Sequence, residues 1–65
     1  MKITLNGEAV EISGRTLADA LTELGYAGQQ VATAVNAEFV PRARRAALAL
    51  SAGDRIEVVT PRQGG

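Results

Sequence analysis

Hydrophobic and polar residues alternate at the start of the chain. Over residues 1–6 the apolar side chains fall at every second position, which is the period of a half-buried β-strand. Asn6-Gly7 then favours a two-residue type I′ turn, because both residue types tolerate positive φ. The predicted hairpin brings apolar side chains opposite one another and pairs opposite charges. Its register places Ile3 opposite Val10, Met1 opposite Ile12 and Lys2 opposite Glu11.

A helical period follows the hairpin. Thr16, with Asp19 three positions later, suits a helix N-cap followed by an acidic residue in the first turn. Gly25 suits the left-handed residue that commonly follows a helix. Between these signals the apolar residues recur at helical spacing and form one stripe: Leu17, Ala20, Leu21 and Leu24. We expect this stripe to pack on a sheet.

The second half of the chain predicts three more strands. After a loop over residues 26–30, Val31–Val35 and Glu38–Val40 read as strands joined by a tight turn at Asn36-Ala37. Pro41 ends the pairing, because proline has no N–H to donate. Ile56 and Val58 alternate with charged residues in the final strand, which we expect to run from residue 55 to residue 60.

Residues 42–47 are rich in helix formers but too few to make a stable helix without packing. We expect a turn or short helix here, anchored by Leu48 and Leu50. Arg42, Arg44 and Arg45 are interpreted as a solvated face or, alternatively, as a docking patch for a partner, together with the nearby Phe39.

The element order predicts an α+β protein with a β-grasp fold. A mixed sheet of four to five strands should carry one main helix across one face, with the last strand central beside the first. Residues 1–60 are expected to form this domain. Residues 61–65 are expected to form a flexible diglycine tail.

Composition excludes several classes of function. The chain has 65 residues, with neither Cys nor His, so it lacks a thiol nucleophile, a zinc-ligand set and the side chain that titrates near neutrality. Seven basic residues balance seven acidic ones, and only two residues are aromatic, which argues against a nucleic-acid partner. No apolar run approaches a membrane span and no signal peptide is apparent, so we expect a cytoplasmic protein with no membrane partner.

The remaining candidate chemistry lies in the last four residues. Glycine has no Cβ, so Gly64-Gly65 can enter a channel too narrow for other residues. The Gly65 α-carboxylate is ionised at neutral pH and is therefore a poor electrophile. Any chemistry at that carbon needs a partner that activates it.

Four segments give the chain a resemblance that covers nearly its whole length. They are residues 1–8 (MKITLNGE), residues 31–42 (VATAVNAEFVPR), residues 53–59 (GDRIEVV) and the diglycine 64–65. In this order and spacing they resemble the ThiS sulfur carriers of thiamine biosynthesis, a ubiquitin-like family of small β-grasp proteins.

The resemblance implies that the chain is a covalent co-substrate and not an enzyme. An E1-like, ThiF-type enzyme would use ATP to adenylate Gly65, and sulfur from a donor such as a cysteine desulfurase would make a thiocarboxylate. A ThiG-type thiazole synthase would accept that sulfur. The carrier would bind no cofactor and supply no catalytic side chain, and Gly64, Gln63 and Arg62 would be recognised along the tail.

Other functions remain open from the sequence. A molybdopterin-synthase-type small subunit shares the fold, the diglycine and the activation, and differs in the acceptor enzyme. A ubiquitin-like protein modifier would join its tail to lysines, and a plain interaction domain would have no tail chemistry.

Overall fold

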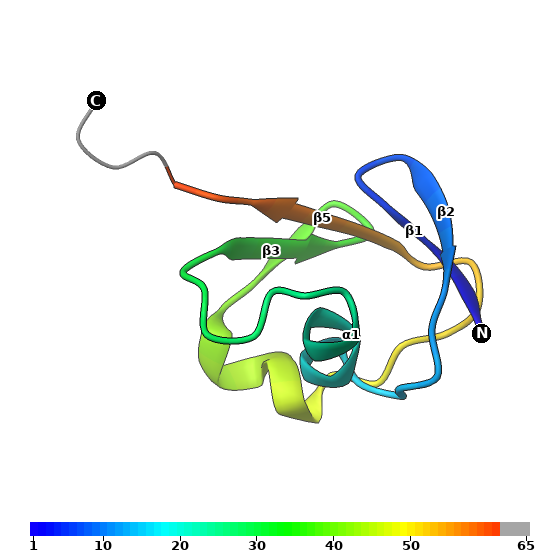
Figure 1. Ribbon diagram of the computed structural model, residues 1–65, viewed down its shortest axis with the longest axis horizontal. Helices are drawn as coiled ribbons and strands as arrows, with labels where there is room; N and C mark the ends of the chain where they lie inside the picture. Colours follow the sequence, from blue (N-terminus) through cyan, green and yellow to red (C-terminus); the bar gives the residue numbers. More distant parts are fainter. Residues whose placement is uncertain (62–65) are drawn as a thin grey trace.

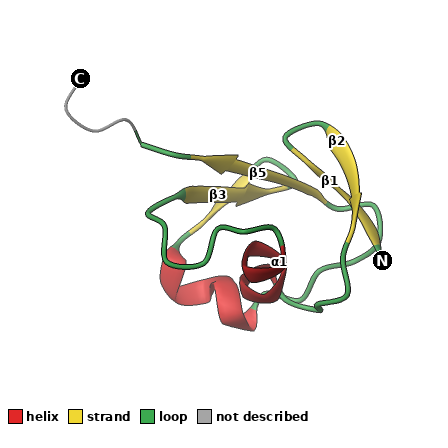
Figure 2. Cartoon of the chain, in the orientation of Figure 1, coloured by secondary structure: helices red, strands yellow, loops and turns green. Residues whose placement is uncertain are grey.

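The computed structural model describes residues 1–61, which form one five-stranded mixed sheet with both helical segments on one of its faces (Figures 1 and 2). The strands lie in the order β2-β1-β5-β3-β4. The elements along the chain are β1 (Lys2–Leu5), β2 (Glu8–Glu11), α1 (Leu17–Glu23), β3 (Ala32–Val35), β4 (Glu38–Val40), the 3₁₀ helix η1 (Arg42–Ala47) and β5 (Arg55–Val59). The predicted α+β class is confirmed, and β5 lies centrally beside β1 as expected.

The first hairpin has the predicted register. Lys2 lies opposite Glu11 and Ile3 opposite Val10 in an antiparallel pair. Asn6 and Gly7 both have positive φ, at 49° and 86°, as a type I′ turn requires. The local alternation and the turn residues therefore agree, and together they fix which side chains face the core.

The second hairpin, β3 with β4, turns at Asn36-Ala37 as predicted. The φ of Ala37 is 72°, a region that alanine adopts at a steric cost. Longer-range contacts hold the turn: the Asn36 backbone N–H donates to the Arg55 carbonyl at 2.8 Å. Pairing with the central strand thus supports a turn that its own sequence favours less strongly than the first.

Helix α1 begins at the predicted cap and ends within one residue of the predicted stop. The Thr16 hydroxyl accepts a hydrogen bond from the Asp19 backbone N–H at 3.1 Å. Leu24 is the C-cap and half-buried, and Gly25 follows with a φ of 92°. The helical stripe is buried at Leu17, Ala20 and Leu21.

The connection between β2 and α1 is held against the helix by Glu23, a polar residue outside the apolar stripe. The Glu23 carboxylate accepts backbone N–H groups from Ser13, at 2.9 and 3.0 Å, and from Gly14. A Cβ on Gly14 would lie 2.4 Å from the Cβ of Asp19, so only glycine fits where the connection crosses the helix. The helix is therefore positioned by a carboxylate as well as by its apolar face.

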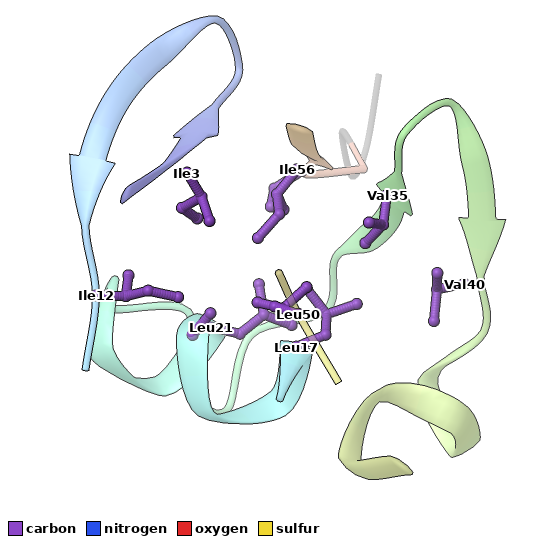
Figure 3. Packing of buried hydrophobic residues seen from close by; sticks show 10 residues of the cluster. Ile3, Ile12, Leu17, Leu21, Val35, Val40, Leu50 and Ile56 are labelled. Carbon is purple, nitrogen blue, oxygen red and sulfur yellow. The ribbon is translucent and has the colours of Figure 1, made fainter. Parts of the chain in front are cut away.

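The hydrophobic core lies between the sheet and α1 (Figure 3). Ile3 and Ile56 point from the sheet toward Leu17 and Leu21, and Leu50 closes the layer from the connection after η1. Leu17 and Ile56 are fully buried. The ten buried apolar residues are Ile3, Ile12, Leu17, Ala20, Leu21, Val35, Val40, Leu50, Ile56 and Val58.

One polar side chain is buried with this core in the described part of the chain. The Thr33 hydroxyl donates to the Val40 carbonyl at 2.8 Å and accepts from Arg45 Nε at 3.1 Å. Arg45 also donates through Nη2 to the Val31 carbonyl at 2.6 Å. Through these bonds Arg45 fastens η1 to β3.

Replacing Leu21 by Ala should destabilise the protein by about 2 to 5 kcal/mol, because it removes a buried side chain and leaves a cavity under the sheet. Chemical denaturation measures the change. The control is Thr22→Ala, an exposed position on the same helix where a change within about 0.5 kcal/mol is expected. Equal midpoints for Leu21→Ala and the wild type would contradict the packing described.

Candidate functional site

The central strand β5 carries the chain toward the predicted site. Its alternate residues Ile56 and Val58 are buried, so the strand is anchored up to its penultimate position. Beyond it, Thr60 and Pro61 are exposed. The predicted tail residues Arg62, Gln63, Gly64 and Gly65 lie outside the described residues, so the geometry of the site is that of the frame from which they extend.

β5 is held on its two sides by different means. On the β3 side the pairing continues to the end of the strand, with Ala32 opposite Val59. On the β1 side the register ends at Leu5 opposite Ile56. The Asn6 side chain then takes over: Oδ1 accepts the Val58 N–H at 2.9 Å, and Nδ2 donates to the Val58 carbonyl at 3.2 Å.

The sequence interpretation gave Asn6 a role in its turn and missed this contact with β5. The choice of Asn at this positive-φ position was a partial signal for such a contact. Gly would adopt the turn equally well but has no side-chain amide to offer. Only the register between the first and last strands brings the amide to Val58, which is 52 residues away in sequence.

The sheet face opposite the helices carries the large exposed apolar side chains of the described residues. Phe39 is 69% exposed and Val59 is 63% exposed. Both lie on this face, because paired residues share a face and the register joins Phe39 to Ala34 and Ala34 to Glu57, two residues before Val59. Phe39 thus lies on the same open surface as the last residue of the strand that leads to the tail.

The three candidate arginines occupy different environments. Arg42 and Arg44 are exposed, whereas Arg45 is half-buried and bonded to Thr33 and Val31. Arg42 and Arg45 line a surface hollow that Pro61 also borders, while Arg44 lines another hollow with Phe39. The structure therefore brings Arg42 near Pro61, where the described chain ends, and Arg44 near Phe39 at the β4 edge of the sheet. It also gives Arg45 a bonding role that sequence reasoning did not predict.

Among residues 1–61 there is no group of three or more potential metal-ligating residues. Within the same range no helix has the length and apolar character needed to cross a membrane. What the arrangement offers is a rigid strand, an apolar surface beside it and two exposed arginines.

Comparison with known proteins gives two kinds of similarity. The chain is 38% identical over 66 residues to a thiazole synthase of Paramagnetospirillum magneticum (strain ATCC 700264 / AMB-1), and it spans about a fifth (20%) of that relative's length. A crystal structure of the thiamine biosynthesis protein ThiS from Geobacter metallireducens superposes with a TM-score of 0.84, at 26% identity and with full coverage of both chains.

A solution structure of a thiamine biosynthesis protein from the same organism agrees, with a TM-score of 0.78 at 26% identity, covering all of this chain and 88% of that one. The shared architecture is the ubiquitin-like β-grasp fold. A sequence model of the ThiS family matches residues 3–65, which is nearly the whole chain and includes the diglycine. The chain therefore belongs to the ThiS family, the sulfur-carrier family that its sequence resembles.

Proposed function

We propose that this chain carries sulfur for thiazole formation in thiamine biosynthesis, as a thiocarboxylate on Gly65. The observation that supports this most directly is the ThiS family match over residues 3–65, since it includes the residues that would be modified. The anchored strand β5 supports it as well, because a carrier needs a rigid base from which a slender tail can reach a distant active site.

The proposed chemistry exchanges one carboxylate oxygen for sulfur. A Gly65 carboxylate oxygen attacks the α-phosphorus of ATP, and pyrophosphate leaves. The acyl adenylate now has a good leaving group, so a sulfide-level nucleophile attacks the carbonyl carbon and AMP departs with the oxygen. If the donor is a persulfide, its outer sulfur attacks and an acyl disulfide forms. A thiol reductant then supplies the two electrons that break the S–S bond, which frees the donor as a thiol and leaves the thiocarboxylate. The product is an anion with a soft, nucleophilic sulfur.

The partner enzymes supply the catalytic groups in this scheme, and the carrier supplies reach and recognition. Gly64 keeps the tail thin, because it has no side chain to collide with a channel wall. Gln63 and Arg62 would contact the channel mouth. ATP binds the activating partner, and the carrier itself needs no cofactor.

Three partners follow from the proposal. An E1-like, ThiF-type enzyme adenylates the tail, a sulfur donor such as a cysteine desulfurase delivers the sulfur, and a ThiG-type thiazole synthase accepts it. The relative named as a thiazole synthase supports the last of these, because part of that longer protein is similar to this chain.

We place the docking of the activating enzyme on the open sheet face and its margin. Exposed Phe39 and Val59 provide apolar area on this face, and Arg42 and Arg44 on η1 provide positive charge for an acidic partner surface. The sequence-based docking set also included Arg45. Its guanidinium is hydrogen-bonded to Thr33 and Val31, so a docking partner would have to compete with these bonds or bind the remaining N–H groups.

Incubation with the activating enzyme, ATP and a sulfur donor should convert the carrier to a species in which one oxygen is replaced by sulfur. Intact-mass measurement detects the exchange, and the unreacted protein, whose mass must match a chain ending at Gly65, is the control. Fragmentation should place the change on Gly65. A change on an internal residue would refute the proposal. Sulfur transfer to a molybdopterin synthase instead of a thiazole synthase would assign a different acceptor.

Removing Gly64 and Gly65 should leave the unfolding temperature nearly unchanged and abolish ATP–pyrophosphate exchange. The fold should be insensitive because the core lies within residues 3–58, and activity should fall by at least about a hundredfold because the carboxylate ends short of the reacting phosphorus. Gly64→Val should show the same separation, because its branched side chain fills a narrow channel. Wild-type exchange rates in either variant would contradict a carrier role for the diglycine.

Arg42→Glu and Arg44→Glu should each slow association with the activating enzyme at low salt and have less effect at high salt, because exposed charges act mainly through steering. Stopped-flow association rates measure this. Arg15→Glu, the same change of charge at an exposed position before α1, is the matched control and should have a smaller effect. Equal effects at all three positions would show that η1 is an ordinary solvated face.

A further inference from the structure

The strand that leads to the tail extends past the strand beside it. On the β1 side, the Thr4 N–H donates to the Asp54 carbonyl at 3.0 Å and the Asn6 N–H donates to the Ile56 carbonyl at 2.9 Å. The chain then turns back at Gly7 and leaves β5 without a backbone neighbour on that side. β5 itself continues to Val59.

The backbone N–H and C=O groups of Val58 point into this gap. Backbone groups of successive residues in a strand point to opposite sides, so Val58 faces the same side as Ile56, toward β1. Its side chain is buried, with 7% of its surface exposed. Unpaired backbone N–H and C=O groups at such a position are costly and would also leave the end of the strand free to move.

The Asn6 amide fills the gap by acting as a short piece of strand. One carboxamide provides both an acceptor, at 2.9 Å from the Val58 N, and a donor, at 3.2 Å from the Val58 O. If β1 continued beside β5 in their parallel pairing, two different residues of β1 would provide these two groups. The hydrogen bonding on this side of β5 therefore extends beyond Ile56 to Val58, which lies three residues before Pro61.

We propose that Asn6 is a positioning residue for the tail: its amide fixes Val58 and so sets the direction in which the chain leaves the sheet toward its reactive end. This rests on the proposed carrier function. Without the amide, the end of β5 is held on the β3 side alone, through the pairing of Val59 with Ala32. The tail then spends less time aligned with the active site of the activating enzyme.

Asn36 provides a matched control within the same molecule. It also occupies the first position of a tight turn with positive φ, at 51°, and its amide also binds β5. Its Oδ1 accepts the Arg55 N–H at 3.0 Å, and its Nδ2 donates to Asp54 Oδ1 at 3.1 Å. It therefore makes the same kind of contact at the start of β5, where the direction of the tail is not set.

The first test needs no partner enzyme. Asn6→Gly and Asn36→Gly keep a residue that accepts positive φ and remove only the amide. Amide hydrogen exchange by NMR should show Val58 exchanging about tenfold faster in Asn6→Gly and within about twofold of wild type in Asn36→Gly. Arg55 should show the reverse. Unchanged protection of Val58 in Asn6→Gly would overturn the proposal.

The second test measures adenylation kinetics of the folded variants with the activating enzyme. Asn6→Gly should lower kcat about tenfold with KM within about twofold of wild type, because alignment is lost while the docking face is intact. Asn36→Gly should leave both constants within about twofold. A loss in KM alone, or equal losses in both variants, would show that Asn6 contributes only to stability or docking.

A third variant keeps the test decisive if Asn6→Gly folds poorly. Asn6→Asp keeps the acceptor for the Val58 N–H and loses the donor to its carbonyl, so protection of Val58 should be retained and kcat should fall between wild type and Asn6→Gly. A kcat for Asn6→Asp at or below that of Asn6→Gly would overturn the role assigned to the amide. If the wild type is not adenylated at all, the carrier function fails, and the exchange result still decides whether Asn6 holds the end of β5.

Discussion

Burial of the central strand is the constraint on which the rest of this protein depends. Ile56 is fully buried and Val58 nearly so, and β5 is paired with β1 on one side and β3 on the other. This strand joins the two hairpins of the sheet and also leads to the residues proposed to react. A domain of this size buries a small core, so stability and presentation of the tail draw on the same few apolar side chains.

Much of the fold could be predicted because its signals are local. The alternation before Asn6-Gly7 specified the first hairpin, and Thr16 with Gly25 bounded the helix. Other features depend on partners distant in sequence. The 3₁₀ form of residues 42–47 is held by Arg45 on Thr33 and Val31, contacts that no periodicity within the segment encodes.

The proposed reactive residue, Gly65, stays a prediction from the sequence, whereas the frame that leads to it was only partly predictable. Two glycines after a final strand indicated a tail from residue type alone, because glycine's lack of a side chain is itself the signal. The frame depends on how separate elements are aligned with one another. This alignment determines the exposure of Phe39, the hydrogen bonds between Asn6 and Val58, and which arginines are exposed. Such register follows from the whole sheet, and a single segment does not contain it.

The position of β5 also has a consequence for how the protein is made. Each hairpin, and α1 with its cap, consists of residues close together in the chain. Within residues 1–61, however, the two halves of the sheet are joined only through β5. During synthesis on the ribosome, the sheet cannot close until residues 55–59 have emerged. A partner that recognises the closed sheet face would therefore bind only chains in which β5 has already joined the two hairpins.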